Sequence, residues 1–232
     1  MGRALRIDRG GYVYHVVNRA NARMMIFADE ADYAAFERIM LAAQERTHMR
    51  LLAWCVMPNH WHMIVWPRKD GDLARFFGWL TLTHTQRWHA HRRTAGQGHV
   101  YQGRYRSFLV EAEDYLWSGC RYVERNALRA GLVERAEHWR WGSLWRWANR
   151  RKQLQDVPTL DDWPVDRPRN WVQRVNQPES QAELDALRLC TQRGRPYGPS
   201  DWVQRMADQL GLRATLRPRG RPRRGDSDEK GS

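Results

Sequence analysis

Long apolar stretches are absent from this sequence of 232 residues. No run of about 18 consecutive apolar residues occurs, so we expect no helix that spans a membrane. The first residues, MGRALRIDRGG, also lack the apolar segment that a secretory signal requires, so we expect no signal peptide.

Cysteine is scarce and widely scattered. The three cysteines, Cys55, Cys120 and Cys190, are odd in number and far apart in the chain. This spacing argues against a disulfide framework and against a zinc site built from thiolates. It is typical of a protein of the reducing cytoplasm, which is the compartment we expect.

Acidic residues are too few to balance the basic ones. The chain has 39 lysines and arginines against 26 aspartates and glutamates, which gives a net charge of +13 and a pI of about 10.4. Arginine makes up most of the excess, and its planar guanidinium suits phosphate better than lysine does. A pI above about 9 is typical of nucleic-acid-binding domains, although a generic basic surface or a membrane-surface protein would share this composition. Thirteen tryptophans suit base stacking as well as a core.

Residue periodicity predicts seven elements before residue 132. Strands are predicted at 12–18, 50–57, 60–66 and 104–111. Helices are predicted from Asp29 onward, at 72–91 and at 113–129. The first six elements follow the order of a ferredoxin-like split βαβ unit, an antiparallel sheet with helices packed on it. We therefore expect an α+β fold in which the last helix is an addition.

The composition changes after about residue 150. We expect a main domain over 1–150 and, because regular periodicity is lost, a linker wrapped on that domain over 151–178. Two short helical patterns predict a small DNA-binding appendage over 179–212. The end of the chain, 213–232, is rich in arginine, proline and glycine, and we expect a basic tail that is disordered when unbound.

Two histidines lie two residues apart on the third predicted strand. Because side chains alternate along a strand, His60 and His62 share one face, while Trp61 points to the other and can be buried. Two imidazoles on one face can converge on one metal ion. Taken alone, the tripeptide His60-Trp61-His62 is also consistent with two histidines that bind no metal and lie at the polar end of a strand.

A tyrosine and an asparagine share a face of the helix predicted at 113–129. Tyr122 and Asn126 are four residues apart. Tyr122 can supply a hydroxyl nucleophile, and the amide oxygen of Asn126 suits a hard metal ion. A packed core tyrosine and a surface or capping asparagine are the alternatives. Tyr115 is a rival nucleophile, but four residues after it lies Gly119, which offers no ligand.

Two motifs together resemble a known family. They are Cys55-Val56-Met57-Pro58-Asn59-His60-Trp61-His62 and, downstream, Arg121-Tyr122-Val123-Glu124-Arg125-Asn126-Ala127-Leu128-Arg129-Ala130-Gly131-Leu132-Val133. In this order and spacing the chain resembles the single-tyrosine HUH transposases, and more closely the REP-associated tyrosine transposases, relatives of the IS200/IS605-type enzymes. The resemblance covers about residues 9–150. It departs from the family at Ala127, where proline is frequent.

The resemblance implies a transposase-like endonuclease and strand transferase that acts on single-stranded or hairpin DNA of the REP type. It implies that His60, His62 and Asn126 hold Mg²⁺ or Mn²⁺. It further implies that Tyr122 attacks the phosphate and forms a 5′-phosphotyrosine. The arginines expected to contact DNA are Arg19, Arg23, Arg104, Arg121, Arg129, Arg193, Arg195, Arg219 and Arg221. The active unit is expected to be a monomer or a homodimer.

Several features leave alternatives open. Six further histidines lack a partner at ligand spacing and are expected at the surface or on DNA: His15, His84, His89, His91, His99 and His138. The tetrapeptide RGRP occurs at 193–196 and 219–222, and the second copy resembles an AT-hook, an arm that reads the minor groove. A purely electrostatic tail is the alternative. Two other functions are an inactive nucleic-acid-binding regulator and a metal phosphodiesterase that uses water and does not need Tyr122.

Overall fold

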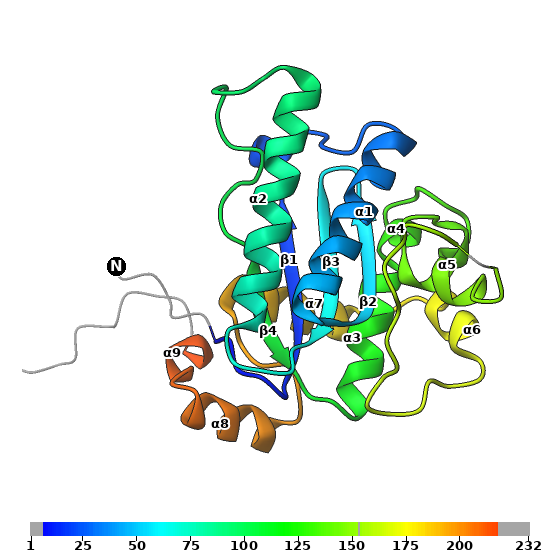
Figure 1. Cartoon of the computed structure of the whole chain (residues 1–232). Helices are drawn as coiled ribbons and strands as arrows, with labels where there is room; N and C mark the ends of the chain where they lie inside the picture. The colour runs from blue at the N-terminus through cyan, green and yellow to red at the C-terminus, as the bar shows by residue number, and fades with distance from the viewer. Residues whose placement is uncertain (1–6, 153, 218–232) are drawn as a thin grey trace, which may run out of the picture.

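Four strands form one antiparallel sheet in the computed structural model of the chain, which describes residues 7–152 and 154–217 (Figure 1). The strands are β1 (Val13–Arg19), β2 (Arg50–Met57), β3 (His60–Trp66) and β4 (Arg106–Val110). Their order across the sheet is β2-β3-β1-β4, and each neighbouring pair is antiparallel. The four predicted strands are therefore confirmed.

Two long helices, α1 (Glu30–Thr47) and α2 (Asp72–Arg92), cover one face of this sheet. Asp29 begins α1 by accepting the backbone N–H of Asp32, which satisfies a donor at the helix start. Phe36 and Met40 recur at helical spacing on the buried side of α1. Together with the strand order, these helices give the ferredoxin-like α+β arrangement that the sequence predicts.

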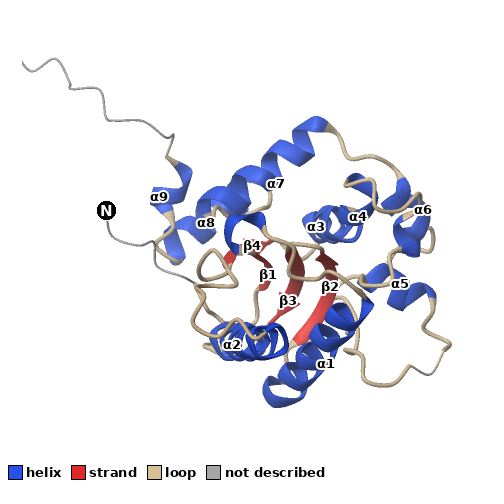
Figure 2. Ribbon diagram, turned by 90° about the horizontal axis from the view of Figure 1, so that it is seen from above, coloured by secondary structure: helices blue, strands red, loops and turns tan. Residues whose placement is uncertain are grey.

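Shorter helices cover the opposite face, so the sheet lies between two helical layers (Figure 2). These helices are α3 (Asp114–Glu124), α4 (Asn126–Arg129), α5 (Ser143–Ala148), α6 (Trp171–Asn176) and α7 (Gln181–Arg193). Burial on both faces explains why β2 is apolar throughout, since every residue from Leu51 to Met57 is buried. The outer edge of β2 is also covered, because its backbone pairs with Trp141 and Asp161.

The helix predicted at 113–129 is not continuous, which corrects the sequence-based expectation. It is interrupted at Arg125, so Tyr122 lies on α3 and Asn126 begins α4. The guanidinium of Arg129 folds back and donates to the carbonyl oxygen of Tyr122 at 3.2 and 3.3 Å. A continuous helix would use this oxygen for its own backbone hydrogen bond, so the arginine competes with the helix at the break.

Residues beyond 150 are more ordered than their composition suggests. The expected linker at 151–178 contains α6, whose Trp171 is buried in the core beneath the sheet. Helix α7 packs against β4, and Tyr197 then exchanges backbone hydrogen bonds with Leu109 and Glu111. The next helix, α8 (Ser200–Gln209), is the second of the two helices predicted in the 179–212 appendage.

The expectation of disorder over 213–232 is wrong at its start. Arg213–Leu216 forms a short helix, α9, and Arg213 pairs with Asp208 of α8. Arg219, Arg221 and the second RGRP copy lie outside the described residues. No helix among the described residues is long and apolar enough to cross a membrane.

Glu124 at the end of α3 should be important for stability. Its buried carboxylate accepts hydrogen bonds from the Ser143 hydroxyl at 2.5 Å and the Trp171 indole at 2.6 Å. Glu124→Ala should lower the free energy of unfolding by about 2 to 4 kcal/mol, because two buried donors lose their acceptor. Denaturant unfolding measures this loss. The exposed Glu45 serves as a matched control, and equal effects of Glu124→Ala and Glu45→Ala would contradict the prediction.

Candidate active site

Strand β3 presents His60 and His62 on the face of the sheet that α3 covers. The intervening Trp61 is fully buried on the other face, in the core formed with α1 and α2. The two imidazole rings lie 5.1 Å apart between centroids. His62 is 5% exposed, whereas His60 is only partly buried. The alternation along the strand therefore produces the shared face that the sequence predicts.

Tyr122 lies across from this pair. Its ring meets the His62 ring edge-on with 5.9 Å between centroids, and the guanidinium of Arg129 lies 4.3 Å from the ring centroid. The same cavity is lined by His60, His62, Tyr122 and Asn126. Despite the break between α3 and α4, Asn126 therefore lines the same cavity as the two histidines.

Tyr115, the rival nucleophile, lies elsewhere. It packs against Tyr197 with 4.9 Å between ring centroids and is not among the residues that line the cavity. The described geometry therefore favours Tyr122 over Tyr115 as the residue that shares a site with the histidines.

Each histidine of the pair is held through its Nδ1 atom. The Nδ1 of His60 lies 2.6 Å from the side-chain oxygen of Asn59, and the Nδ1 of His62 lies 2.9 Å from the Nε2 of His15. The Nε2 atoms of His60 and His62 have no partner among the described residues. His15 itself is 1% exposed, which corrects the expectation that it lies at the surface or on DNA.

Both histidines are expected to be neutral at pH 7. Burial lowers the pKa of His60 to about 4, helped by the nearby cations Arg19 and Arg129. Burial, and then the neighbouring His15 and His60, lower the pKa of His62 well below its usual range. A neutral imidazole keeps the lone pair with which it binds a metal ion.

The residues present fit a divalent cation. Asn126 lines the cavity, and its Nδ2 is buried without a hydrogen-bond partner among the described residues. No group of three or more His, Cys, Asp or Glu side chains suited to a metal occurs in the described ranges, and the amide oxygen of Asn126 is the third ligand that the sequence predicts. Two nitrogens and one neutral oxygen leave coordination positions for phosphate and water.

The cavity continues into a basic groove. Its volume is about 990 Å³, and its described lining contains no aspartate or glutamate. Six arginines line it: Arg19, Arg104, Arg106, Arg129, Arg188 and Arg193. Of the arginines expected to contact DNA, the structure thus brings Arg19, Arg104, Arg129 and Arg193 together with the histidines. Arg106 and Arg188 were not singled out by the sequence.

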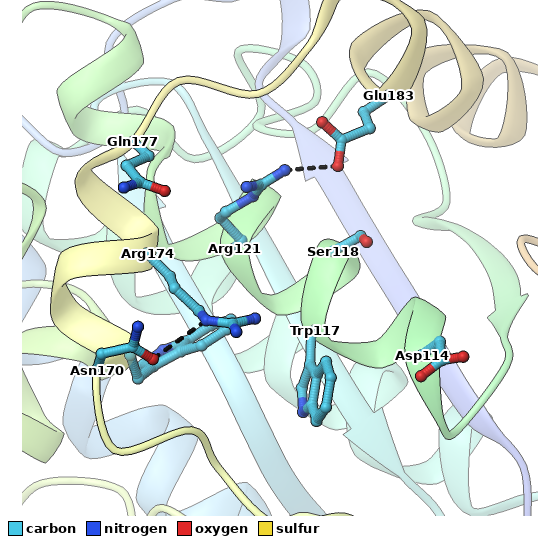
Figure 3. Close-up of a pocket in the computed structure, with 9 residues that line it drawn as sticks. Asp114, Trp117, Ser118, Arg121, Asn170, Arg174, Gln177 and Glu183 are labelled. Carbon is cyan, nitrogen blue, oxygen red and sulfur yellow. Dashed lines mark hydrogen bonds and ion pairs between the residues drawn. The ribbon is translucent and has the colours of Figure 1, made fainter.

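Three other predicted arginines, Arg23, Arg121 and Arg195, are not part of the groove lining. Arg121 instead lines a smaller cavity of about 370 Å³ between α3, α6 and α7. There it forms an ion pair with Glu183 at 2.5 Å, close to Arg174 and Trp117 (Figure 3). Its neighbour in the sequence, Tyr122, belongs to the other cavity.

Glu179 is a contributor to the site that sequence reasoning missed. This buried carboxylate, in the loop before α7, pairs with Arg129 at 2.6 Å and with Arg125 at 3.0 Å. It therefore holds the guanidinium that lies over Tyr122. Glu179 lies fifty residues after Arg129 in the chain, so no local sequence pattern indicates that the two side chains pair.

A family model described as "Transposase IS200 like" matches residues 10–126. The chain belongs to this family. His60, His62, Tyr122 and Asn126 all fall inside the matched range, and Asn126 is its last residue. The family is one of transposases, which supports an enzyme that cleaves DNA.

One similar solved structure supports the same fold. A REP-associated tyrosine transposase bound to a REP hairpin is 18% identical, with a TM-score of 0.53, and the match covers 72% of this chain and 98% of that one. A candidate transposase from Deinococcus radiodurans R1 is 17% identical with a TM-score of 0.36, covering 48% and 85%. The comparison with curated proteins finds no match.

The histidine pair predicts metal binding that persists into mildly acidic solution. Because the pKa of His60 is lowered to about 4, protons should displace Mn²⁺ only well below the pH of about 6.5 at which a free imidazole titrates. Isothermal titration calorimetry at several pH values measures this. His60→Ala and His62→Ala should lose binding, whereas the exposed His99 offers a control. A midpoint near pH 6.5 would contradict the lowered pKa.

Proposed function

We propose that this transposase-family protein is a metal-dependent enzyme that cuts and rejoins single-stranded DNA. The observation that carries the proposal is the cavity that Tyr122 shares with the partly buried His60 and the buried His62, whose Nε2 atoms have no partner among the described residues. A bound Mg²⁺ or Mn²⁺ would polarise the scissile phosphate and offset the charge that develops on it. His60, His62 and Asn126 would hold this ion.

The nucleophile in this proposal is the Tyr122 hydroxyl. It attacks the phosphorus, the bond from phosphorus to the 3′-oxygen breaks, and a 5′-phosphotyrosine and a free 3′-hydroxyl result. The guanidinium of Arg129 packs over the Tyr122 ring and restricts its orientation. Because the phosphotyrosine retains the energy of the broken bond, a 3′-hydroxyl can reverse the step and join strands.

The groove supports nucleic acid as the substrate. Arg19, Arg104, Arg106 and Arg193 have no ion-pair partner among the described residues. Unpaired guanidinium groups in a groove that lacks described carboxylates suit phosphate. The similar solved transposase is bound to a REP hairpin, and we propose a single strand with a REP-type hairpin as the substrate here. A cytoplasmic monomer or homodimer is the proposed active unit.

Two alternatives predict different products. A regulator with an inactive centre would bind the same DNA without cleaving it. A phosphodiesterase that uses water would cleave DNA but would not form a covalent adduct. The position of Tyr122 beside His62 favours the covalent mechanism over both.

Tyr122→Phe should abolish the covalent adduct while DNA binding is retained, because only the hydroxyl is removed. Labelled single-stranded hairpins incubated with Mn²⁺ and run on a denaturing gel measure the adduct. Tyr115→Phe is the matched control and should leave the adduct intact. An adduct that survives in Tyr122→Phe and disappears in Tyr115→Phe would reverse the assignment, and cleavage by Tyr122→Phe without any adduct would favour the water-using alternative.

The groove arginines should determine how strongly DNA binding depends on salt. In the Tyr122→Phe background, replacing Arg104 and Arg193 with alanine should make the slope of log affinity against log salt shallower by about 0.7 for each lost phosphate contact. Fluorescence anisotropy with a single-stranded oligonucleotide measures the slope.

The matched control for this experiment replaces Arg38 and Arg87 with alanine. Both are exposed, on α1 and α2 across the sheet from the groove. This control removes the same charge from a different surface and should hardly change the slope. Equal slopes for the two double variants would show that the groove has no special role in binding.

A further inference from the structure

His15 is a buried histidine beside the proposed metal ligands. It lies on β1 opposite Ile64 of β3 and is 1% exposed. Its Nε2 lies 2.9 Å from the Nδ1 of His62, and the two rings are stacked with 5.0 Å between centroids. Phe108 packs against His15 at 4.8 Å between centroids, so the ring has little freedom to turn.

The hydrogen bond between the two rings holds one proton, which can reside on either ring. If the proton is on Nδ1 of His62, that ring donates and its Nε2 carries a free lone pair. If the proton is on Nε2 of His15, then neutral His62 must carry its own proton on Nε2. A protonated Nε2 cannot bind a cation, so only the first arrangement supports the proposed metal site.

His60 has no such ambiguity. The side-chain oxygen of Asn59, 2.6 Å from its Nδ1, is only an acceptor. The proton of neutral His60 is therefore on Nδ1, and its Nε2 is free. The two proposed ligands thus differ, because one is paired with a fixed acceptor and the other with a ring that can accept or donate.

The other nitrogen of His15 does not decide between the two arrangements. Its Nδ1 is buried and has no hydrogen-bond partner among the described residues. It remains unpaired whether it carries a proton or a lone pair. A ligand bound at the Nε2 of His62 can therefore determine which of the two rings carries the shared proton.

We propose that His15 is a positioning residue that accepts the Nδ1 proton of His62 and thereby presents the Nε2 lone pair of His62 to a divalent cation. Binding of the cation selects this arrangement of the two rings from the two that are available. The inference rests on the proposed function, because it needs a cation at His60 and His62. The inference adds that the affinity for the cation depends on His15, a residue that does not itself contact the cation.

Mn²⁺ affinity measured by isothermal titration calorimetry tests this role without relying on enzyme activity. In His15→Leu, an apolar side chain fills the space of the ring but offers no acceptor to the Nδ1 of His62. Mn²⁺ affinity should therefore fall by about 10- to 100-fold. His15→Gln can place an amide oxygen near His62, and its affinity should be closer to that of the unaltered protein than to that of His15→Leu.

His84 provides a matched control. It is also buried and bonded through its ring, since its Nδ1 lies 2.7 Å from the Tyr101 hydroxyl, but it belongs to α2 on the other face of the sheet. His84→Leu should leave Mn²⁺ affinity unchanged. If His15→Leu binds Mn²⁺ as tightly as the unaltered protein, or if His84→Leu weakens binding equally, the positioning role is wrong.

A second measurement needs no substitution. Long-range ¹H–¹⁵N NMR spectra of the histidine rings report which nitrogen carries the proton, and at saturating Mg²⁺ the proton should be on Nδ1 of both His15 and His62. A proton on Nε2 of His62 under these conditions would overturn the inference. If the unaltered protein binds neither Mg²⁺ nor Mn²⁺, the metal site of the proposed function fails, and this inference fails with it.

Discussion

The burial of Trp61 between His60 and His62 is the interaction on which the site depends. Its indole stacks on Phe77 at 5.5 Å between centroids and donates a hydrogen bond to the Tyr101 hydroxyl at 3.1 Å. A slip of β3 by one residue would bring both histidines into that apolar core. The register of β3 is therefore set by packing on one face of the sheet, and the chemistry on the other face follows from it.

An ion-pair cluster around the buried Glu179 holds Tyr122 in position. Glu179 binds Arg125 and Arg129 at either end of the short α4, and Arg129 contacts both the ring and the carbonyl oxygen of Tyr122. The Glu179 carboxylate is buried and stable there only because it is paired, and its loss would leave two guanidinium groups without their carboxylate beside the proposed nucleophile. The segment before α7 thus helps to hold the residue proposed as the nucleophile.

Local patterns in the sequence were sufficient for the sheet and for the shared face of His60 and His62, because alternation and apolar runs are local properties. They were not sufficient for His15, which reaches His62 only through the pairing of β1 with β3. The break before Asn126 was also missed, since it involves a side chain that folds back to compete for a backbone carbonyl. The C-terminal helices were expected, but the packing of α7 on β4 was not. Contacts between segments far apart in the chain produce no periodic pattern in the sequence.

The groove is assembled from two stretches of sequence, one inside the range that the family model matches and one beyond it. His60, His62, Tyr122 and Asn126 lie within the matched range of 10–126, whereas Arg188 and Arg193 of the groove lining lie beyond it. A chimeric protein that exchanges only α7 to α9 would thus change part of the groove lining while keeping His60, His62, Tyr122 and Asn126.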